Sequence, residues 1–300
     1  MDMESIYGAM GRRDAAERGG RSGDFDREEW AARKRAEREA AFALADDTAL
    51  LVNGDGAARA ALARVMGRLP GHSATNALLV LAQNPDATRL GDAGYWRRAG
   101  ARIKQGERAI SVIEPTKEFV RQDGTVGMLY DARKVFDASQ TTARPRLPRE
   151  FAAEEVLTAL VARSPVQVSP ADAPVPGGAR YDPAAGEIMV ERGLGAGELF
   201  SCLAREACRA SMDLRGEPAG GGEAELAAAA LGERFGIGGG GALPNLAPEG
   251  SDARAVREAL SRARSAAAEL GGAMARSLEP SSRQDRGGER WGGPSRTRSP

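Results

Sequence analysis

An Asp-Gly pair at positions 123–124 interrupts the extended run KEFVRQDGTVGMLYDARKVFD. This pair suits the tight turn of a β-hairpin, because glycine adopts the positive φ values that such turns require. A second turn is predicted at Gln105-Gly106, within ARIKQGERAISVIEP, and Gly106 is expected to serve that turn. The segment from 95 to 137 therefore predicts a small antiparallel sheet.

Apolar residues recur at helical spacing on both sides of this segment. Helices are predicted at 26–47, 56–68, 73–83, 151–163, 198–213, 223–237 and 252–276. Ser73 is expected to cap the third of them, and a second hairpin is predicted across DPAAGE. The predicted fold class is α+β, with N-terminal helices and a small antiparallel sheet followed by a mostly helical part.

The 300 residues suffice for two domains of ordinary size. The predicted organisation is a disordered segment at 1–25, a first domain at 26–143, a linker at 144–150, a second domain at 151–245, a C-terminal helix at 246–277 and a disordered basic tail at 278–300. Residues 48–145 carry 14 Lys and Arg against 9 Asp and Glu, whereas residues 146–245 carry 9 against 14. The basic part is the one expected to face an anion.

The chain holds one histidine, His72, which argues against a zinc enzyme with several histidine ligands and against a histidine general base. We expect His72 to be a capping or surface residue. Cys202 and Cys208 lie on one predicted helix, where a disulfide is geometrically unfavourable, so free thiols in a reducing cytoplasm are expected. The N-terminus lacks an apolar signal segment, and no run approaches the roughly 18 apolar residues of a membrane helix. We therefore expect a cytoplasmic protein without a membrane partner.

Two aromatic residues, Tyr95 and Trp96, directly precede a group of cations opposed only by Glu107. The cations are Arg97, Arg98, Arg102, Lys104 and Arg108. Single-stranded nucleic acid is bound by this combination, because cations follow the phosphates and exposed rings stack on bases. The alternative is that Trp96 belongs to the core of the small sheet and that the arginines are simply solvated.

The order of several motifs resembles a known family. N-A-L-L-x-x-x-Q-N-P-x-A-T at 76–88 is followed by Trp96, by IKQGERAISVIEP and by VFDASQT at 135–141. This order resembles the N-terminal single-stranded-DNA-binding domain of ArdC-type antirestriction proteins, which has relatives in plasmid conjugation proteins and TraC-type primases. The resemblance covers residues 26–143. It implies binding of single-stranded DNA without sequence specificity.

The resemblance gives the basic segment a set of DNA-binding candidates. Phosphate contacts are expected from Arg97, Arg98, Arg102, Lys104 and Arg108, then from Lys117, Arg133 and Lys134, and base stacking from Tyr95 and Trp96. Asn76 and Gln83 lie seven residues apart on one helix face. They either hydrogen-bond bases or sugars, or only tie the helix to the following loop.

In ArdC-type proteins a zincin-like metallopeptidase domain with an H-E-x-x-H helix follows, and the second domain here resembles it. Arg205 and Arg209 occupy the two histidine positions, Glu206 occupies the position of the general base, and Glu223 or Glu225 corresponds to the third ligand. Arginine stays protonated and has no lone pair for a metal. We therefore expect vestigial positions with no catalytic residue, metal or cofactor. The two arginines are expected to pair with Glu223 and Glu225 and so to hold two helices together.

These expectations combine into one function and two alternatives. The first is non-sequence-specific binding of single-stranded DNA in plasmid transfer, antirestriction or mobile-element maintenance, with a catalytically inactive peptidase-like domain and a restriction or replication protein as a further partner. One alternative is a metal-dependent peptidase with an atypical site that uses Glu206. The other is a protein-interaction scaffold. A simpler interpretation of residues 198–213 is an ordinary amphipathic helix with a solvated Arg-Glu-Arg strip.

Overall fold

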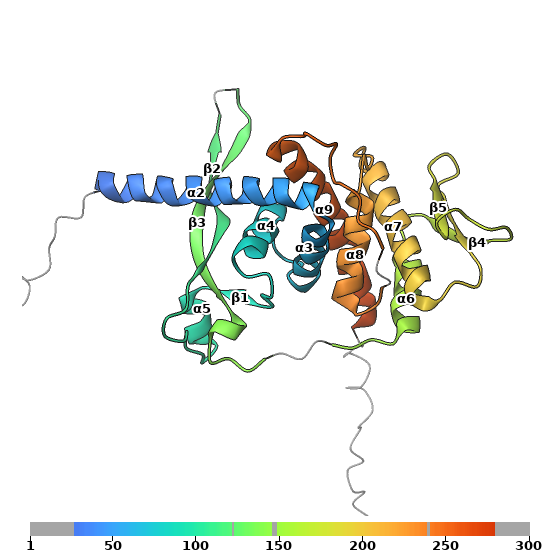
Figure 1. The fold of residues 1–300 in the computed structure, drawn as a ribbon, viewed down its shortest axis with the longest axis horizontal. Helices are drawn as coiled ribbons and strands as arrows, with labels where there is room; N and C mark the ends of the chain where they lie inside the picture. The colour runs from blue at the N-terminus through green and yellow to red at the C-terminus, as the bar shows by residue number, and fades with distance from the viewer. Residues whose placement is uncertain (1–26, 122, 146–148, 239–240, 280–300) are drawn as a thin grey trace, which may run out of the picture. The chain divides into compact units, whose positions relative to one another are not determined.

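A computed structural model describes residues 27–121, 123–145, 149–238 and 241–279 (Figure 1). Its helices are α2 (Arg27–Gly54), α3 (Gly56–Arg68), α4 (Ala74–Gln83), α5 (Ala93–Arg98), the 3-10 helix η1 (Ala138–Gln140), α6 (Ala153–Arg163), α7 (Ala196–Leu214), α8 (Glu223–Phe235) and α9 (Ala253–Leu278). Its strands are β1 (Leu90–Gly91), β2 (Ile110–Val120), β3 (Val126–Asp137), β4 (Gln167–Ala171), β5 (Ala179–Asp182) and β6 (Glu187–Glu191). The α+β class is confirmed. The predicted disordered segments are 1–25 and 278–300. They lie outside the described part except for residues 278 and 279, which form the end of α9 and its C-cap.

The chain divides into two compact units that differ from the predicted domains. Among the described residues, one unit comprises those from 27 to 42 and from 113 to 133, and the other comprises those from 43 to 112 and from 134 to 279. The predicted linker at 144–150 therefore does not separate the units. Because α3 packs against α8 and α4 packs against α9, these two helices share a core with the later ones. Gly67 allows this close approach, since a Cβ atom there would lie 2.6 Å from the carbonyl oxygen of Ala230.

Helices form the core of the larger unit, where α7, α8 and α9 pack on one another and α6 packs on α7 and α9 (Figure 1). Their facing sides are aliphatic and rich in alanine. Phe200 and Leu203 on α7 and Leu226 and Leu231 on α8 are among its fully buried side chains. Small residues between them let helices approach closely. None of the described helices is both long and apolar enough to cross a membrane.

The predicted hairpins are largely confirmed. The strands β2 and β3 pair around Gly124, whose φ is +82°, and β5 pairs antiparallel with β6 across DPAAGE. The strand β4 was not predicted, and it pairs parallel with β6 at the edge of the second sheet. Its Pro170 obscures the strand pattern, but an edge strand tolerates a residue without a backbone N–H.

The predicted extended run after Gln105-Gly106 is confirmed as the first part of β2, whereas the predicted run before it is not a strand. Gly106 does turn the chain, with a φ of +83°. Residues 93–98 form the helix α5 instead, capped by the side chain of Asp92. The loop after it makes its backbone hydrogen bonds with residues 140–142, not with β2. Within the described residues, its pairing is limited to one isolated bridge between Ile103 and Thr141.

Candidate functional site

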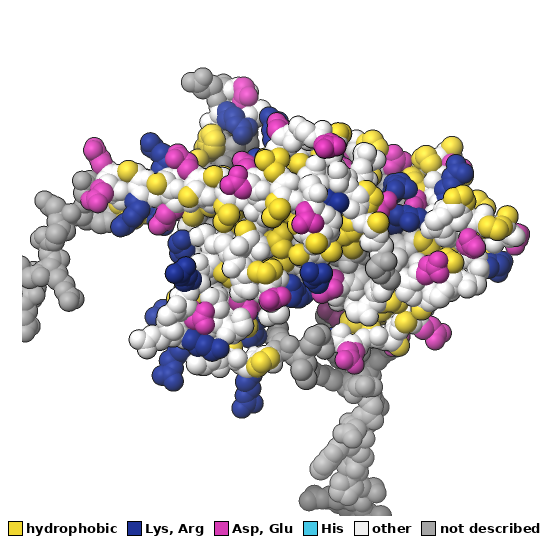
Figure 2. All heavy atoms as spheres, in the orientation of Figure 1, with side chains coloured by type: hydrophobic (Ala, Val, Ile, Leu, Met, Phe, Trp, Pro, Cys, Tyr) yellow, Lys and Arg dark blue, Asp and Glu magenta, His cyan; other side chains and the backbone are white. Residues whose placement is uncertain are grey.

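The helix α5 and the loop that follows it carry the five cations from which phosphate contacts are first expected. Lys and Arg side chains gather over this part of the molecule in Figure 2. The exposed members are Arg97, Arg98, Arg102, Lys104 and Arg108. Lys104 donates through Nζ to the carbonyl of Ser139 at 2.7 Å. The four arginines form no ion pair with another described residue. Their charges are therefore available to an anionic ligand.

Trp96 does not have the position expected of a stacking residue. Its side chain is 1% exposed and lies in a small core with Ala101 and Ala138. Its indole Nε1 donates to the carbonyl of Phe136 at 3.0 Å, and the guanidinium of Arg89 lies 4.8 Å from the ring centroid. A buried ring cannot stack on a base, which corrects the stacking expectation for Trp96. Trp96 therefore belongs to the core, as the alternative interpretation of the sequence proposed.

Tyr95 is the aromatic residue that this surface presents to solvent. Its side chain is 39% exposed, and its ring meets that of Trp96 edge-on with centroids 5.0 Å apart. The ring lies so close to Gly91 that a methyl group at residue 91 would collide with it. A fixed ring with one exposed side can accept a base by stacking.

Asn76 and Gln83 take part in the packing and hydrogen bonding of the fold. The amide of Gln83 accepts from the backbone N–H of Ser111 at 2.9 Å and donates to the carbonyl of the same residue at 2.9 Å. This pair of hydrogen bonds links α4 to β2. It is close to the second alternative for these residues, in which they only tie the helix to the following loop. Asn76 is buried, and its backbone N–H donates to the Ser73 hydroxyl, so the predicted cap of α4 is confirmed. A buried amide is not positioned to reach a base.

The second-rank cations belong to different compact units. Lys117 and Arg133 lie in the smaller one, where Arg133 is 3.5 Å from Glu114. Lys134 lies in the larger one and donates through Nζ to the hydroxyl of Ser111 at 2.6 Å. These three residues therefore do not all belong to the unit that carries α5, and they do not form one site with it within that unit.

Asp137 connects the sequence motifs at 76–88 and 135–141, a role that the sequence analysis missed. Its buried carboxylate accepts from the backbone N–H groups of Thr88 at 2.7 Å, Arg89 at 2.8 Å and Ser139 at 2.8 Å. Burial by itself raises the pKa of this carboxyl group, but the backbone donors, led by Arg89, hold the pKa below its ordinary value. The aspartate thus fixes the loop before β1 against the end of β3.

A second cluster of charged side chains lies on α7, at the positions that resemble the H-E-x-x-H helix. The carboxylate of Glu206 is 2% exposed in its side chain. Arg205 Nε lies 2.8 Å from its Oε1, and Arg209 Nη1 lies 3.0 Å from Oε1 and 3.1 Å from Oε2. The backbone N–H of Tyr181 donates to Oε2 at 3.1 Å. Both oxygens of Glu206 are therefore occupied by donors from its own helix and from β5.

The expected pairing of the arginines with the carboxylates of α8 holds for one pair. Arg209 Nη2 lies 3.3 Å from Glu225 Oε1, which links α7 to α8. Arg205 instead donates through Nη2 to the carbonyl of Gly177 at 2.9 Å. The fully buried Glu223 accepts from Arg262 of α9 at 2.7 Å, so the pairing expected of Glu223 with the two arginines is corrected.

These residues do not fit the metal site of the family they resemble. The guanidinium groups at the two histidine positions donate hydrogen bonds and offer no lone pair. Cys208, which directly precedes Arg209, is fully buried, and burial raises the pKa of its thiol to about 12. Among the described residues, no group of three or more His, Cys, Asp or Glu side chains is arranged to hold a metal ion. The cluster is built as an ion-pair network.

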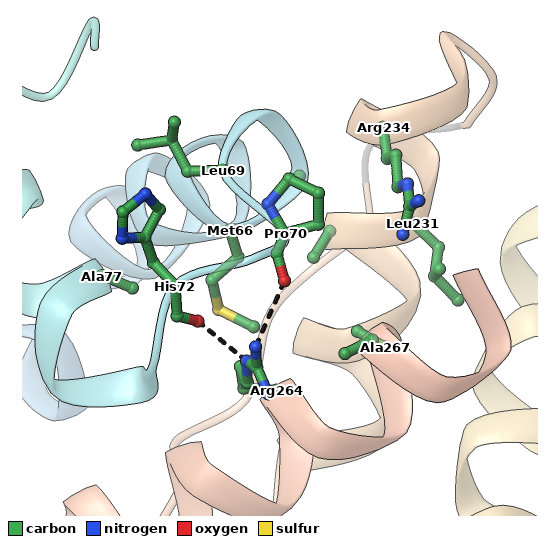
Figure 3. Close-up of a pocket in the computed structure, with 12 residues that line it drawn as sticks. Met66, Leu69, Pro70, His72, Ala77, Leu231, Arg234, Arg264 and Ala267 are labelled. Carbon is green, nitrogen blue, oxygen red and sulfur yellow. Dashed lines mark hydrogen bonds between the residues drawn. The ribbon is translucent and has the colours of Figure 1, made fainter. Parts of the chain in front are cut away.

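A small pocket lies beside α3, α4, α8 and α9 (Figure 3). Its lining includes Met66, Leu69, Ala77, Leu231 and Ala267. The guanidinium of Arg264 donates to the carbonyls of His72 at 2.8 Å and Pro70 at 3.2 Å, so it ties the loop after α3 to α9. Arg234 stacks on Phe235 with its guanidinium carbon 5.4 Å from the ring centroid. The described lining residues provide no converging set of polar groups that would select a ligand.

Comparison with solved structures finds similar chains, among them two structures of one protein. No protein-family model matches the chain, and no curated protein matches it. The metal-free crystal structure of the antirestriction protein ArdC from plasmid R388 is 18% identical with a TM-score of 0.47, and the match covers 68% of this chain and 86% of that one. For the Mn(II)-bound structure of the same protein the identity is 17% and the TM-score 0.48, with 68% and 85% covered. The sequence motifs resemble the same family.

Proposed function

We propose that this protein binds single-stranded DNA without reading its sequence, through the surface formed by α5 and the loop after it. The observation that carries the proposal is the set of four exposed arginines that form no ion pair with another described residue, beside the fixed, exposed ring of Tyr95. Such cations neutralise phosphates whatever the sequence, and a ring stacks on any base. The surface carries one exposed ring, so affinity is expected to depend mainly on charge.

The motifs at 76–88 and 135–141 support the same function, because they resemble the DNA-binding domain of ArdC-type proteins. The similar crystal structures are of an antirestriction protein from a plasmid. We place the proposed binding in that setting. The ligand is then a plasmid strand that enters a cell as single-stranded DNA.

The α7 cluster is assigned a structural role within this proposal. A general base must reach the proton that it removes, but both oxygens of Glu206 already accept hydrogen bonds. An atypical peptidase that uses Glu206 is therefore disfavoured. The larger unit then serves to position the binding surface.

The test is a binding titration with three labelled oligonucleotides of equal length: single-stranded DNA, duplex DNA and single-stranded RNA. The proposal predicts saturable binding of oligo(dT) at low salt, weaker binding of the duplex, and similar affinities for single strands of different sequence. Absence of binding to all single strands at low salt would overturn it and favour an interaction scaffold. Peptide cleavage that requires Glu206, measured against Glu206→Gln, would instead support the peptidase.

A further inference from the structure

The smaller unit contains a groove that the sequence analysis did not single out. One wall is the first half of α2 and the other is the β2–β3 hairpin, which Figure 1 shows beside it. From α2 come Trp30, Ala31, Lys34, Arg35 and Arg38, and from the hairpin come Thr116, Leu129, Tyr130 and Asp131. All of these residues lie within one compact unit. The groove is therefore a feature of that unit alone.

The helix presents these side chains because of their spacing. Positions 30, 34 and 38 are four residues apart, so they lie along one face of α2. Arg38 Nη1 reaches the carbonyl of Tyr130 at 3.5 Å, and the hydroxyl of Thr116 donates to the carbonyl of Leu129 at 3.1 Å. The first contact joins the two walls of the groove, and the second lies within the hairpin wall.

The lining combines exposed rings with positive charge. Trp30 is 41% exposed and Tyr130 is 43% exposed, one on each wall. Three cations, Lys34, Arg35 and Arg38, line the groove against one carboxylate, that of Asp131. Lys34 shares its charge with Glu37 at 2.9 Å. An apolar partner helix would gain little from such a lining, whereas an anionic ligand with flat rings matches both of its features.

We propose that this groove is a second contact site for the single-stranded DNA of the proposed function, on which it rests. In this site bases stack on Trp30 and Tyr130 while Arg35 and Arg38 contact the adjoining phosphates. The site adds aromatic stacking, whereas the α5 surface contributes mainly charge. It also gives a role to the charged half of α2, which the resemblance to the family left without one.

The test measures the affinity of the full chain for oligo(dT) by fluorescence anisotropy at fixed salt. Trp30→Ala and Tyr130→Ala are each expected to weaken binding about five-fold or more, because a base–aromatic stack contributes on the order of 1 kcal/mol or more. Tyr130→Phe keeps the ring and is expected to bind like the wild type. Phe119→Ala is the matched control, since Phe119 is an exposed ring of the same hairpin outside the groove.

A second readout reports on the groove directly. In a Trp291→Phe background, the remaining tryptophans are the half-exposed Trp30 and the buried Trp96. Saturating oligo(dT) is expected to quench the emission of this protein, and the further change Trp30→Phe is expected to abolish the quenching. This readout does not depend on how much affinity the ring contributes.

The outcomes separate the two proposals. Suppose that the wild type binds oligo(dT) and that Arg97→Ala/Arg98→Ala weakens this binding. If Trp30→Ala and Tyr130→Ala then bind like the wild type, and oligo(dT) does not quench Trp30 in the Trp291→Phe protein, the groove proposal is overturned and the α5 surface stands. If the wild type does not bind at low salt, the proposed function fails first. If Tyr130→Phe loses as much affinity as Tyr130→Ala, stacking is not the contribution of this residue and the proposal is overturned.

Discussion

Arg209 and Glu206 face each other across one turn of α7, with one guanidinium nitrogen 3.0 and 3.1 Å from the two carboxylate oxygens. The carboxylate is buried, and the same guanidinium reaches Glu225 on α8. A buried carboxylate is costly without donors, so the arginine compensates the burial of Glu206 and connects two helices.

Removing this donor is expected to destabilise the fold. Arg209→Met keeps the apolar stem but leaves Glu206 with fewer donors, so the free energy of unfolding should fall by about 1.5–3 kcal/mol. Chemical denaturation measures the change. Arg180→Met is the matched control, because Arg180 is an exposed arginine of the same unit, and it should alter stability by less than about 0.5 kcal/mol. Equal stability of Arg209→Met and the wild type would contradict the structural role.

Introducing histidine at positions 205 and 209 is expected to create a metal site. In Arg205→His/Arg209→His the two imidazoles lie four residues apart on one helix face, and Glu225 supplies a carboxylate nearby. This variant should retain about one zinc ion per chain after dialysis, whereas the wild type should retain none, because its two arginines offer no lone pair. Metal analysis by mass spectrometry measures both. Stoichiometric zinc in the wild type would contradict the conclusion that the residues around Arg205 and Arg209 do not fit a metal site.

Asp137 is expected to make stability depend on pH. Its pKa is lowered in the folded state, so its contribution is complete above the unfolded-state pKa of about 3.9 and is lost as the pH falls through the folded-state pKa. Asp137→Asn should therefore lower the free energy of unfolding near pH 7, and the difference from the wild type should shrink below about pH 4. The exposed Asp86→Asn is the control and should show little difference at either pH. A difference that is constant with pH would contradict the role of the carboxylate.

Trp96 and Tyr95 are expected to respond differently to substitution. Trp96→Phe removes the hydrogen bond to Phe136 and should lower the free energy of unfolding by about 1–3 kcal/mol, while oligo(dT) affinity of the folded protein stays unchanged. Tyr95→Ala should weaken binding and leave the salt dependence nearly unchanged, since it removes a ring and no charge. Denaturation and anisotropy titrations separate the two effects. A loss of affinity with Trp96→Phe at undiminished stability would place the indole in the binding surface after all.

The sequence predicted features that depend on neighbouring residues. Ser73 caps α4, Gly124 turns the hairpin, and α3 spans 56–68 as expected, because each follows from local spacing and turn chemistry. The segment at 93–98 was misjudged, because a helix of six residues is too short for a helical period to distinguish it from a strand. That error also left open which of the two adjacent rings, Tyr95 or Trp96, faces solvent.

Interactions between distant segments could not be predicted. Glu223 pairs with Arg262, 39 residues later, and no local pattern favours this partner over Arg205 or Arg209. Asp137 lies at the end of a predicted strand, and two of its three backbone donors, Thr88 and Arg89, come from a segment 48 or 49 residues earlier that only the fold brings close. The groove beside Trp30 likewise depends on how α2 packs on a hairpin more than 70 residues away.

The most direct test of the proposed DNA binding is the salt dependence of oligo(dT) affinity in the wild type and in Arg97→Ala/Arg98→Ala. If both arginines contact phosphates, the slope of log K against log salt becomes shallower by about 1.4 in the variant, because each lost contact contributes about 0.7 on a single strand. The control Arg180→Ala/Arg276→Ala removes the same charge from exposed positions outside this surface and should keep the wild-type slope. Identical slopes for the wild type and the Arg97/Arg98 variant would contradict the account.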